Sequence, residues 1–124
     1  MPPLNAIHAS NVRIATDLPE SLVGVFAGGT SGIGENTVKA FARYVKKPQI
    51  YFFGRSTEAG ERIKSECEAI NSAGCYYFES ADLAVLENVD RVCRIVAEKE
   101  GENGVNLVCV SQAVVYNPER VLLM

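Results

Sequence analysis

The residues with the clearest chemical use form a glycine-rich segment near the N-terminus, Ala27-Gly28-Gly29-Thr30-Ser31-Gly32-Ile33-Gly34. The segment follows the apolar run 22–26 and leads into an amphipathic helical pattern, which suits a strand, a turn and a helix N-terminus. Glycine permits a tight turn and a close approach of the backbone to a ligand. Because the first N–H groups of a helix are free and lie at its positive end, the segment predicts a phosphate-binding turn. A glycine-rich turn without a ligand is the alternative.

The spacing of Gly28, Gly32 and Gly34 resembles the cofactor turn of the short-chain dehydrogenase/reductase family, although Ala27 stands where that family usually has threonine. The resemblance implies that the turn binds a dinucleotide, with the hydroxyl groups of Thr30 and Ser31 beside the phosphates. The cofactor contacts that it implies in the turn are Gly28, Thr30, Ser31, Gly32, Ile33 and Gly34.

The segment 49–56, Gln-Ile-Tyr-Phe-Phe-Gly-Arg-Ser, resembles the family's second strand and the loop after it. Gly54 lies twenty residues after Gly34, where an acidic residue would bond the ribose 2′-hydroxyl of NAD. Arg55 follows, and its planar cation can pair with a 2′-phosphate that an acid would repel. We therefore expect NADP(H) as the cofactor, in contact with Arg55 and Ser56. A surface arginine that begins a loop is the alternative.

The third match is Ser80-Ala81-Asp82-Leu83, which follows the apolar run 75–78. In the family the matching pair contacts the adenine, so the resemblance implies that Asp82 and Leu83 bind the cofactor. Asp82 also suits the N-cap of a helix that runs from Val85 onward, and the two roles are compatible.

The family pattern changes after the apolar run 105–110, which reads as a fourth buried strand. Most members have Asn-Asn-Ala-Gly there, whereas this chain has Ser111-Gln112-Ala113 and is similar to an atypical filamentous-fungal branch. Ala113 replaces the glycine and adds a Cβ where the backbone normally approaches the cofactor.

No catalytic residue is assigned. The family's acid is the tyrosine of a Tyr-x-x-x-Lys pair, in which the lysine lies one helical turn away and lowers the phenol pKa. None of the five tyrosines has lysine four residues later, and the last lysine is Lys99. Tyr116 and Arg120 have the spacing, but Pro118 lies between them and arginine does not replace lysine in this role.

The elements that must position these residues follow from the apolar spacing. Strands alternate with helices, which predicts an α/β fold: a partial Rossmann-type, doubly wound parallel sheet with helices on both faces and, as the resemblance implies, strand order 3-2-1-4. Residues 1–20 read as a loose lead-in, and residues 21–124 as a truncated NADP-binding Rossmann domain. The expected helix faces are Ile33, Val38, Phe41, Ala42 and Val45; Ala59, Ile63, Cys67 and Ile70; and Val85, Val89, Val92, Cys93 and Val96.

The fourth strand would be an apolar sheet edge with unpaired backbone groups. We therefore expect a poorly stable chain, a homo-oligomer or partner complex formed through this edge, or an edge covered by the tail Val121-Leu122-Leu123-Met124.

The composition limits the classes of partner that we expect for this chain. The 124 residues carry a net charge of −3 with no basic cluster, which argues against nucleic acid or an anionic membrane as the main partner. The apolar runs are strand-sized and no leader pattern begins the chain, so we expect a cytoplasmic protein. No metal site is expected because His8 is the only histidine and the cysteines form no Cys-x-x-Cys pair; we expect buried, reduced thiols at Cys67, Cys75, Cys93 and Cys109.

Three functions fit these observations. The family resemblance implies an oxidoreductase that moves hydride between NADP(H) and a small-molecule carbonyl or alcohol, and the fungal branch suggests secondary metabolism. The second is an NADP-binding module without chemistry that acts through a partner. The third is a truncated product of a gene for a full enzyme.

Overall fold

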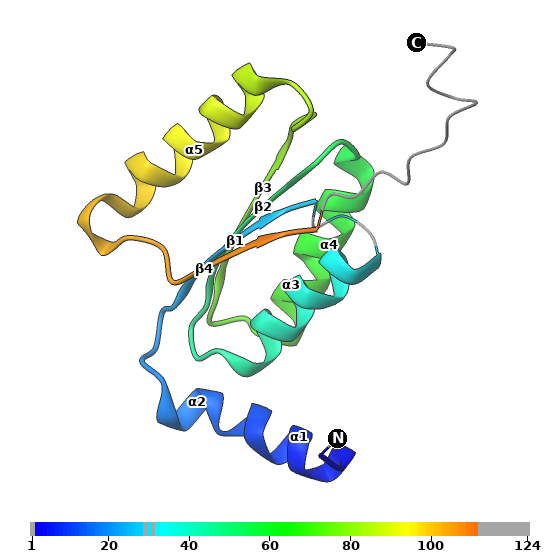
Figure 1. Cartoon of the computed structure of the whole chain (residues 1–124), viewed down its shortest axis with the longest axis vertical. Coiled ribbons are helices and arrows are strands. Elements are labelled where there is room, and N and C mark those ends of the chain that lie inside the picture. Colours follow the sequence, from blue (N-terminus) through cyan, green and yellow to red (C-terminus); the bar gives the residue numbers. More distant parts are fainter. Residues whose placement is uncertain (1, 29, 31, 112–124) are drawn as a thin grey trace.

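A computed structural model describes residues 2–28, 30 and 32–111 of the chain (Figure 1). Four parallel strands form one sheet in the order β3-β2-β1-β4, which confirms the predicted doubly wound topology. The strands are β1 (Val23–Ala27), β2 (Gln49–Gly54), β3 (Cys75–Ser80) and β4 (Leu107–Val110).

Helices cover both faces of the sheet, as predicted. α3 (Gly32–Tyr44) and α4 (Thr57–Ile70) lie on one face, and α5 (Leu86–Glu100), followed by the short 3-10 helix η1 (Gly101–Asn103), lies on the other (Figure 1). Alternate residues of the central strands face opposite helices, so each face has its own core. The core under α3 and α4 is Phe26, Val38, Ala42, Ile50, Phe52, Ile63, Cys67 and Tyr76; the core under α5 is Val23, Tyr51, Phe53, Ala81, Val92 and Val96.

Aromatic side chains form a row across the first of these faces. Phe26 of β1 pairs in register with Phe52 of β2, and Phe52 pairs with Phe78 of β3. The rings of Phe52 and Phe78 lie 5.1 Å apart, and the ring of Phe41 from α3 meets Phe26 edge-on at 5.6 Å. Such contacts add to the burial of apolar area and hold the strands in one register.

Two of the predicted helix faces include residues that are exposed in the structure. Ile33 is 80% exposed because it lies five residues before Val38, which places it about 140° around the helix from that buried side chain. Cys93 is exposed because its neighbour Val92 takes the buried position. Val85 precedes α5 as its N-cap residue and is 44% exposed.

The N-terminal lead-in is helical in the structure, whereas the sequence was expected to be loose there. It forms α1 (Leu4–Val12) and α2 (Ile14–Asp17), and neither helix contains a buried residue. An i,i+4 ion pair between Arg13 and Asp17 spans α2, with 2.7 Å between the side-chain atoms. Among the residues that the structure describes, no helix has the length and apolar composition needed to cross a membrane.

A network of four charged side chains joins α3 to α4. Lys39 lies 2.7 Å from Glu35 and 2.5 Å from Glu66, and Arg62 lies 3.0 Å from Glu35 and 3.2 Å from Glu66. The hydrogen bonds from Arg62 and then Lys39 lower the pKa of Glu35 to about 2. The network thus favours the charged form of Glu35 and fixes the two helices that follow the first two strands.

β4 is the edge strand of the described sheet, as expected. It pairs with β1, and Leu107, Val108 and Val110 are 42%, 63% and 67% exposed. The tail that was expected to cover this edge, Val121 to Met124, lies outside the described residues.

Candidate cofactor-binding site

The glycine turn joins β1 to α3 at the carboxyl end of the sheet. The backbone N–H of Gly28 donates a hydrogen bond of 2.9 Å to the carbonyl oxygen of Phe53, which ties the start of the turn to the end of β2. Gly28 has a φ of 85° and Gly32, the first residue of α3, a φ of 57°. Both values lie in the left-handed region, where glycine has no steric cost, so the local conformation explains these two glycines.

Gly34 serves a different purpose, which is close packing. A Cβ at this position would overlap the carbonyl oxygen of Gly28 and the hydroxyl oxygen of Ser111. A Cβ at Gly32, by contrast, would meet no atom of the described residues within 4 Å, so among these residues the space beside the first turn of α3 is open. An open space at a helix N-terminus, bounded by glycine backbone, suits the phosphates of a dinucleotide, and these residues therefore fit the expected cofactor.

Ser111 connects β4 to the same turn. Its N–H donates to the carbonyl oxygen of Ala27 at 3.0 Å, and its hydroxyl oxygen lies 3.1 Å from the carbonyl oxygen of Gly28 and 3.2 Å from that of Ala27. A hydroxyl carries one proton, so it donates to one of these carbonyl groups at a time. The sequence marked Ser111 only as a departure from the family pattern, and its role in holding the turn depends on β4 lying beside β1.

Arg55 lies at the carboxyl end of β2 with its backbone fixed and its side chain in solvent. The hydroxyl group of Ser80 donates to the carbonyl oxygen of Arg55 at 3.2 Å. Ser56 is the N-cap of α4, and its hydroxyl oxygen accepts from the N–H of Ala59 at 3.1 Å. Within the part of the chain that the structure describes, the guanidinium group of Arg55 forms no ion pair. It is therefore available to an external anion.

Thr30 brings the turn and the end of β2 into contact. Gly54, the last residue of β2, is buried, and a Cβ there would overlap the Cγ2 of Thr30 and lie 2.7 Å from its Oγ1. Thr30 therefore packs against the backbone of the residue that precedes Arg55. No local pattern predicts this contact, because it joins positions 24 residues apart in two separate motifs.

Asp82 and Leu83 follow β3 at the same edge of the sheet. Asp82 is exposed, but it is not the N-cap of α5, so that prediction is wrong. Its carboxylate accepts from the N–H of Ala84 at 3.1 Å and its carbonyl oxygen from the N–H of Val85 at 3.1 Å, so Asp82 forms a turn that ends before the helix begins. Leu83 is half-buried against the core under α5.

The predicted site residues are thus distributed over the carboxyl ends of three neighbouring strands. Gly28, Thr30, Gly32, Ile33 and Gly34 follow β1, Arg55 and Ser56 follow β2, and Asp82 and Leu83 follow β3. Ser31 lies outside the described residues, as do Gln112, Ala113, Tyr116 and Arg120. Ligands of open α/β sheets bind at this end of the strands, so the topology brings the predicted residues to a suitable edge.

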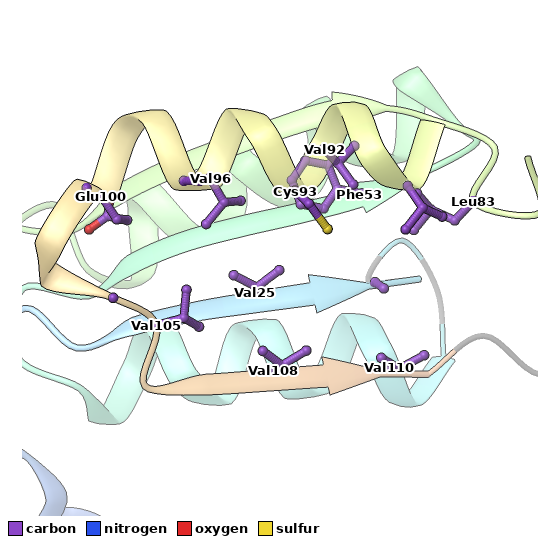
Figure 2. A pocket seen from close by; sticks show the side chains of 15 residues that line it. Val25, Phe53, Leu83, Val92, Cys93, Val96, Glu100, Val105, Val108 and Val110 are labelled. Carbon is purple, nitrogen blue, oxygen red and sulfur yellow. The ribbon is translucent and has the colours of Figure 1, made fainter. Parts of the chain in front are cut away.

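An apolar groove of about 580 Å³ lies on the α5 face of the sheet. Figure 2 shows side chains from α5, β1 and β4 around it, among them Val96, Val25 and Val108. The groove exists because the described part of the chain places one helix on this face, whereas two helices lie on the other.

Three of the four cysteines differ from the prediction of buried thiols. Cys67 is buried, and burial raises the pKa of its thiol to about 11. Cys75 and Cys93 are exposed and Cys109 is half-buried, because Cys75 begins an outer strand and Cys93 lies beside the buried face of α5. Over residues 2–28, 30 and 32–111, no three metal-ligating side chains come together.

Comparison with known proteins supports the family resemblance. No protein-family model matches the sequence. The chain is 38% identical over 99 residues to the oxidoreductase andH of Emericella variicolor, a match that covers 80% of this chain and 29% of that protein. It is 33% identical over 109 residues to the short-chain dehydrogenase/reductase SAT2 of Stachybotrys chartarum, covering 82% of this chain and 30% of that protein. The chain therefore spans less than a third of the length of these fungal relatives.

A solved structure gives the same result for the fold. An alcohol dehydrogenase from the archaeon Thermococcus sibiricus, complexed with 5-hydroxy-NADP, matches with a TM-score of 0.63 and 27% identity, over 72% of this chain and 36% of that one. Sequence and fold together confirm that the chain resembles the N-terminal, cofactor-binding part of the short-chain dehydrogenase/reductase family.

Proposed function

We propose that the chain is the cofactor-binding part of an oxidoreductase that moves hydride between NADP(H) and a small-molecule carbonyl or alcohol. The observation that carries the proposal is the pairing of two features at one edge of the sheet. The first is an open helix N-terminus, formed by Gly28 and Gly32 at positive φ, and the second is the exposed cation Arg55 after the neighbouring strand. The oxidoreductases among the relatives support the same activity.

Each predicted residue has a defined task in this proposal. The free N–H groups at the start of α3 and the hydroxyl groups of Thr30 and Ser31 bind the phosphates, since amide donors at a helix N-terminus favour anions. Arg55 binds the 2′-phosphate bidentately, with Ser56 beside it. Asp82 and Leu83 contact the adenine. When bound, NADPH supplies the hydride.

The substrate class we propose is a ketone or alcohol of fungal secondary metabolism. The fungal origin of the sequence relatives supports this choice. These 124 residues contain no Tyr-x-x-x-Lys pair, so no residue of the chain is assigned to the proton transfer that carbonyl reduction requires.

The lack of a Tyr-x-x-x-Lys pair in these 124 residues favours a second candidate, an NADP-binding module without chemistry that acts through a partner. Such a module would keep the turn and Arg55 and would bind the cofactor without turning over any substrate. The exposed β4 edge offers a surface through which it could act.

Calorimetric titration of the 124-residue chain with NADPH and, separately, NADH tests the proposal. Saturable binding that prefers NADPH is the expected result. Oxidation of bound NADPH on addition of a carbonyl compound would favour the enzyme, whereas binding without turnover would favour the module. A folded chain that binds neither cofactor would contradict both candidates.

A further inference from the structure

The contact between Thr30 and Gly54 has a bearing on cofactor choice. Resting on the proposed function, we infer that Thr30 is a specificity-determining residue: its side chain closes position 54 to the acidic residue that would bind the ribose diol of NAD. Arg55 attracts the 2′-phosphate of NADP, and Thr30 keeps the preceding position free of a carboxylate.

Thr30 lies two residues after a backbone contact between the turn and β2. Gly28 at the start of the turn is hydrogen-bonded to Phe53, the residue before Gly54, with 2.9 Å between nitrogen and oxygen. The turn is therefore held against the end of β2. Two residues later, the methyl and hydroxyl groups of Thr30 lie where the Cβ of residue 54 would be.

Strand pairing and a hydrogen bond hold Gly54 in the sheet. It pairs with Ser80 across the β2–β3 ladder, and its carbonyl oxygen accepts from the N–H of Ala81 at 2.8 Å. Its backbone does not require glycine, because its φ is not positive. The absence of a side chain at position 54 is thus explained by Thr30 and not by backbone conformation.

An aspartate at position 54 would need space for its Cβ and a side-chain conformation in which its carboxylate points toward the ribose of NAD. In this structure the Cβ would point at Thr30, so the carboxylate could reach a ribose only if Thr30 moved or was shortened. Replacing Thr30 with alanine removes the two nearest atoms, Cγ2 and Oγ1. The next nearest is the Cβ of residue 30, at 3.1 Å, a distance that a small shift relieves.

Thermal unfolding tests the contact without any cofactor. We expect Gly54→Ala to lower the Tm and Thr30→Ala/Gly54→Ala to restore most of the loss. The matched control is Thr37→Ala/Gly54→Ala, because Thr37 bonds the carbonyl oxygen of Ile33 on α3 and is not among the nearest atoms to position 54; it should restore nothing. An unchanged Tm for Gly54→Ala, or equal recovery in the control, would overturn the inference.

Calorimetry with NADH and NADPH then tests specificity. Gly54→Asp alone should lower the affinity for NADPH and leave the affinity for NADH no higher than that of the wild type. Because Thr30→Ala also removes a hydroxyl group proposed to bind the phosphates, that single variant is the baseline for the double variant. Thr30→Ala/Gly54→Asp should bind NADH roughly 10- to 100-fold more tightly than Thr30→Ala does, the range for a hydrogen bond to a charged group. If Gly54→Asp raises the affinity for NADH as much in the wild-type chain as in Thr30→Ala, Thr30 is not the barrier and the inference is wrong.

These outcomes separate the inference from the proposed function. A wild-type chain that prefers NADPH, combined with variants that show no dependence on Thr30, would overturn the role of Thr30 alone. A folded wild-type chain that binds neither cofactor would overturn the proposed function and the role of Thr30 in cofactor choice, even if the melting series confirmed the contact.

Discussion

Gly32 combines a positive φ with open space, and each property gives a separate expectation. A valine there would be strained by roughly 1–2 kcal/mol, because an L-residue in the left-handed region brings its Cβ too close to the backbone. Its side chain would also enter the space proposed for the phosphates. We expect Gly32→Val to lower the Tm moderately and to abolish NADPH binding in calorimetry. Retained affinity would show that the cofactor phosphates do not lie beside this turn.

Replacing Arg55 should change cofactor binding without changing the stability of the fold. Since its side chain is exposed and forms no ion pair among the described residues, Arg55→Ala should leave the Tm unchanged. We expect the affinity for NADPH to fall about 10- to 100-fold and that for NADH to stay constant, because only NADPH carries the 2′-phosphate. Arg94→Ala, an exposed arginine on α5, is the matched control. Equal losses for both cofactors would assign Arg55 to a general electrostatic role.

At the scale of elements, the ion network between α3 and α4 predicts how stability changes with pH. The pKa of Glu35 is lowered from 4.5 to about 2 in the folded chain, so its contribution to stability is full above pH 4.5 and is lost as the pH falls toward 2. We expect Glu35→Gln to unfold at a lower temperature than the wild type at pH 6, and the difference to shrink between pH 4.5 and pH 2. Thermal unfolding over a pH series measures this.

A difference in Tm that stays constant over that pH range would show that Glu35 acts through packing and not through charge. Added salt should also reduce the difference at pH 6, since the network is partly exposed to solvent.

The elements themselves were largely predictable from the sequence. Apolar runs of strand length, such as 49–54, alternate with helical spacing, and this periodicity is a local property that each segment carries by itself. The predictions were wrong where two adjacent positions compete for one buried face, as at Val92 and Cys93, and where a helix buries nothing, as in α1. In the second case no apolar pattern exists for the sequence to show.

The candidate site was predictable only in part, for a related reason. The glycine turn and Arg55 are visible because each is a local pattern after a strand. The contacts of Thr30 with Gly54 and of Ser111 with Gly28 join residues from different strands, and they exist only once the order β2-β1-β4 is formed. Spacing along the chain carries no information about such contacts.

At the scale of the whole molecule, the apolar groove on the α5 face and the β4 edge predict self-association. Val108 lies in both features, because it belongs to the edge strand and lines the groove, and it is 63% exposed. We expect the chain to associate with itself through this region and Val108→Lys to weaken the association, since a charge opposes edge pairing and apolar contact. Sedimentation equilibrium at several concentrations measures it.

Leu86→Lys is the control, because Leu86 is 80% exposed but does not line the groove. A wild-type chain that stays monomeric and melts at a high temperature would contradict the prediction. Equal effects of the two variants would place the interface elsewhere.

The central position of β1 has a consequence for synthesis. The N–H of Val23 in β1 donates to the side chain of Asn106 at 2.8 Å, a bond between residues 83 positions apart. The other strand that pairs with β1 is β2, which begins much earlier in the chain, at Gln49. At translation rates of roughly 5–20 residues per second, about 4 to 17 s pass between the synthesis of these two residues. Once β2 has been synthesised, and until β4 follows, β1 can pair with β2 but not with β4. The nascent chain therefore exposes one side of its central strand to the ribosome's surroundings, where a chaperone or a neighbouring nascent chain can reach it first.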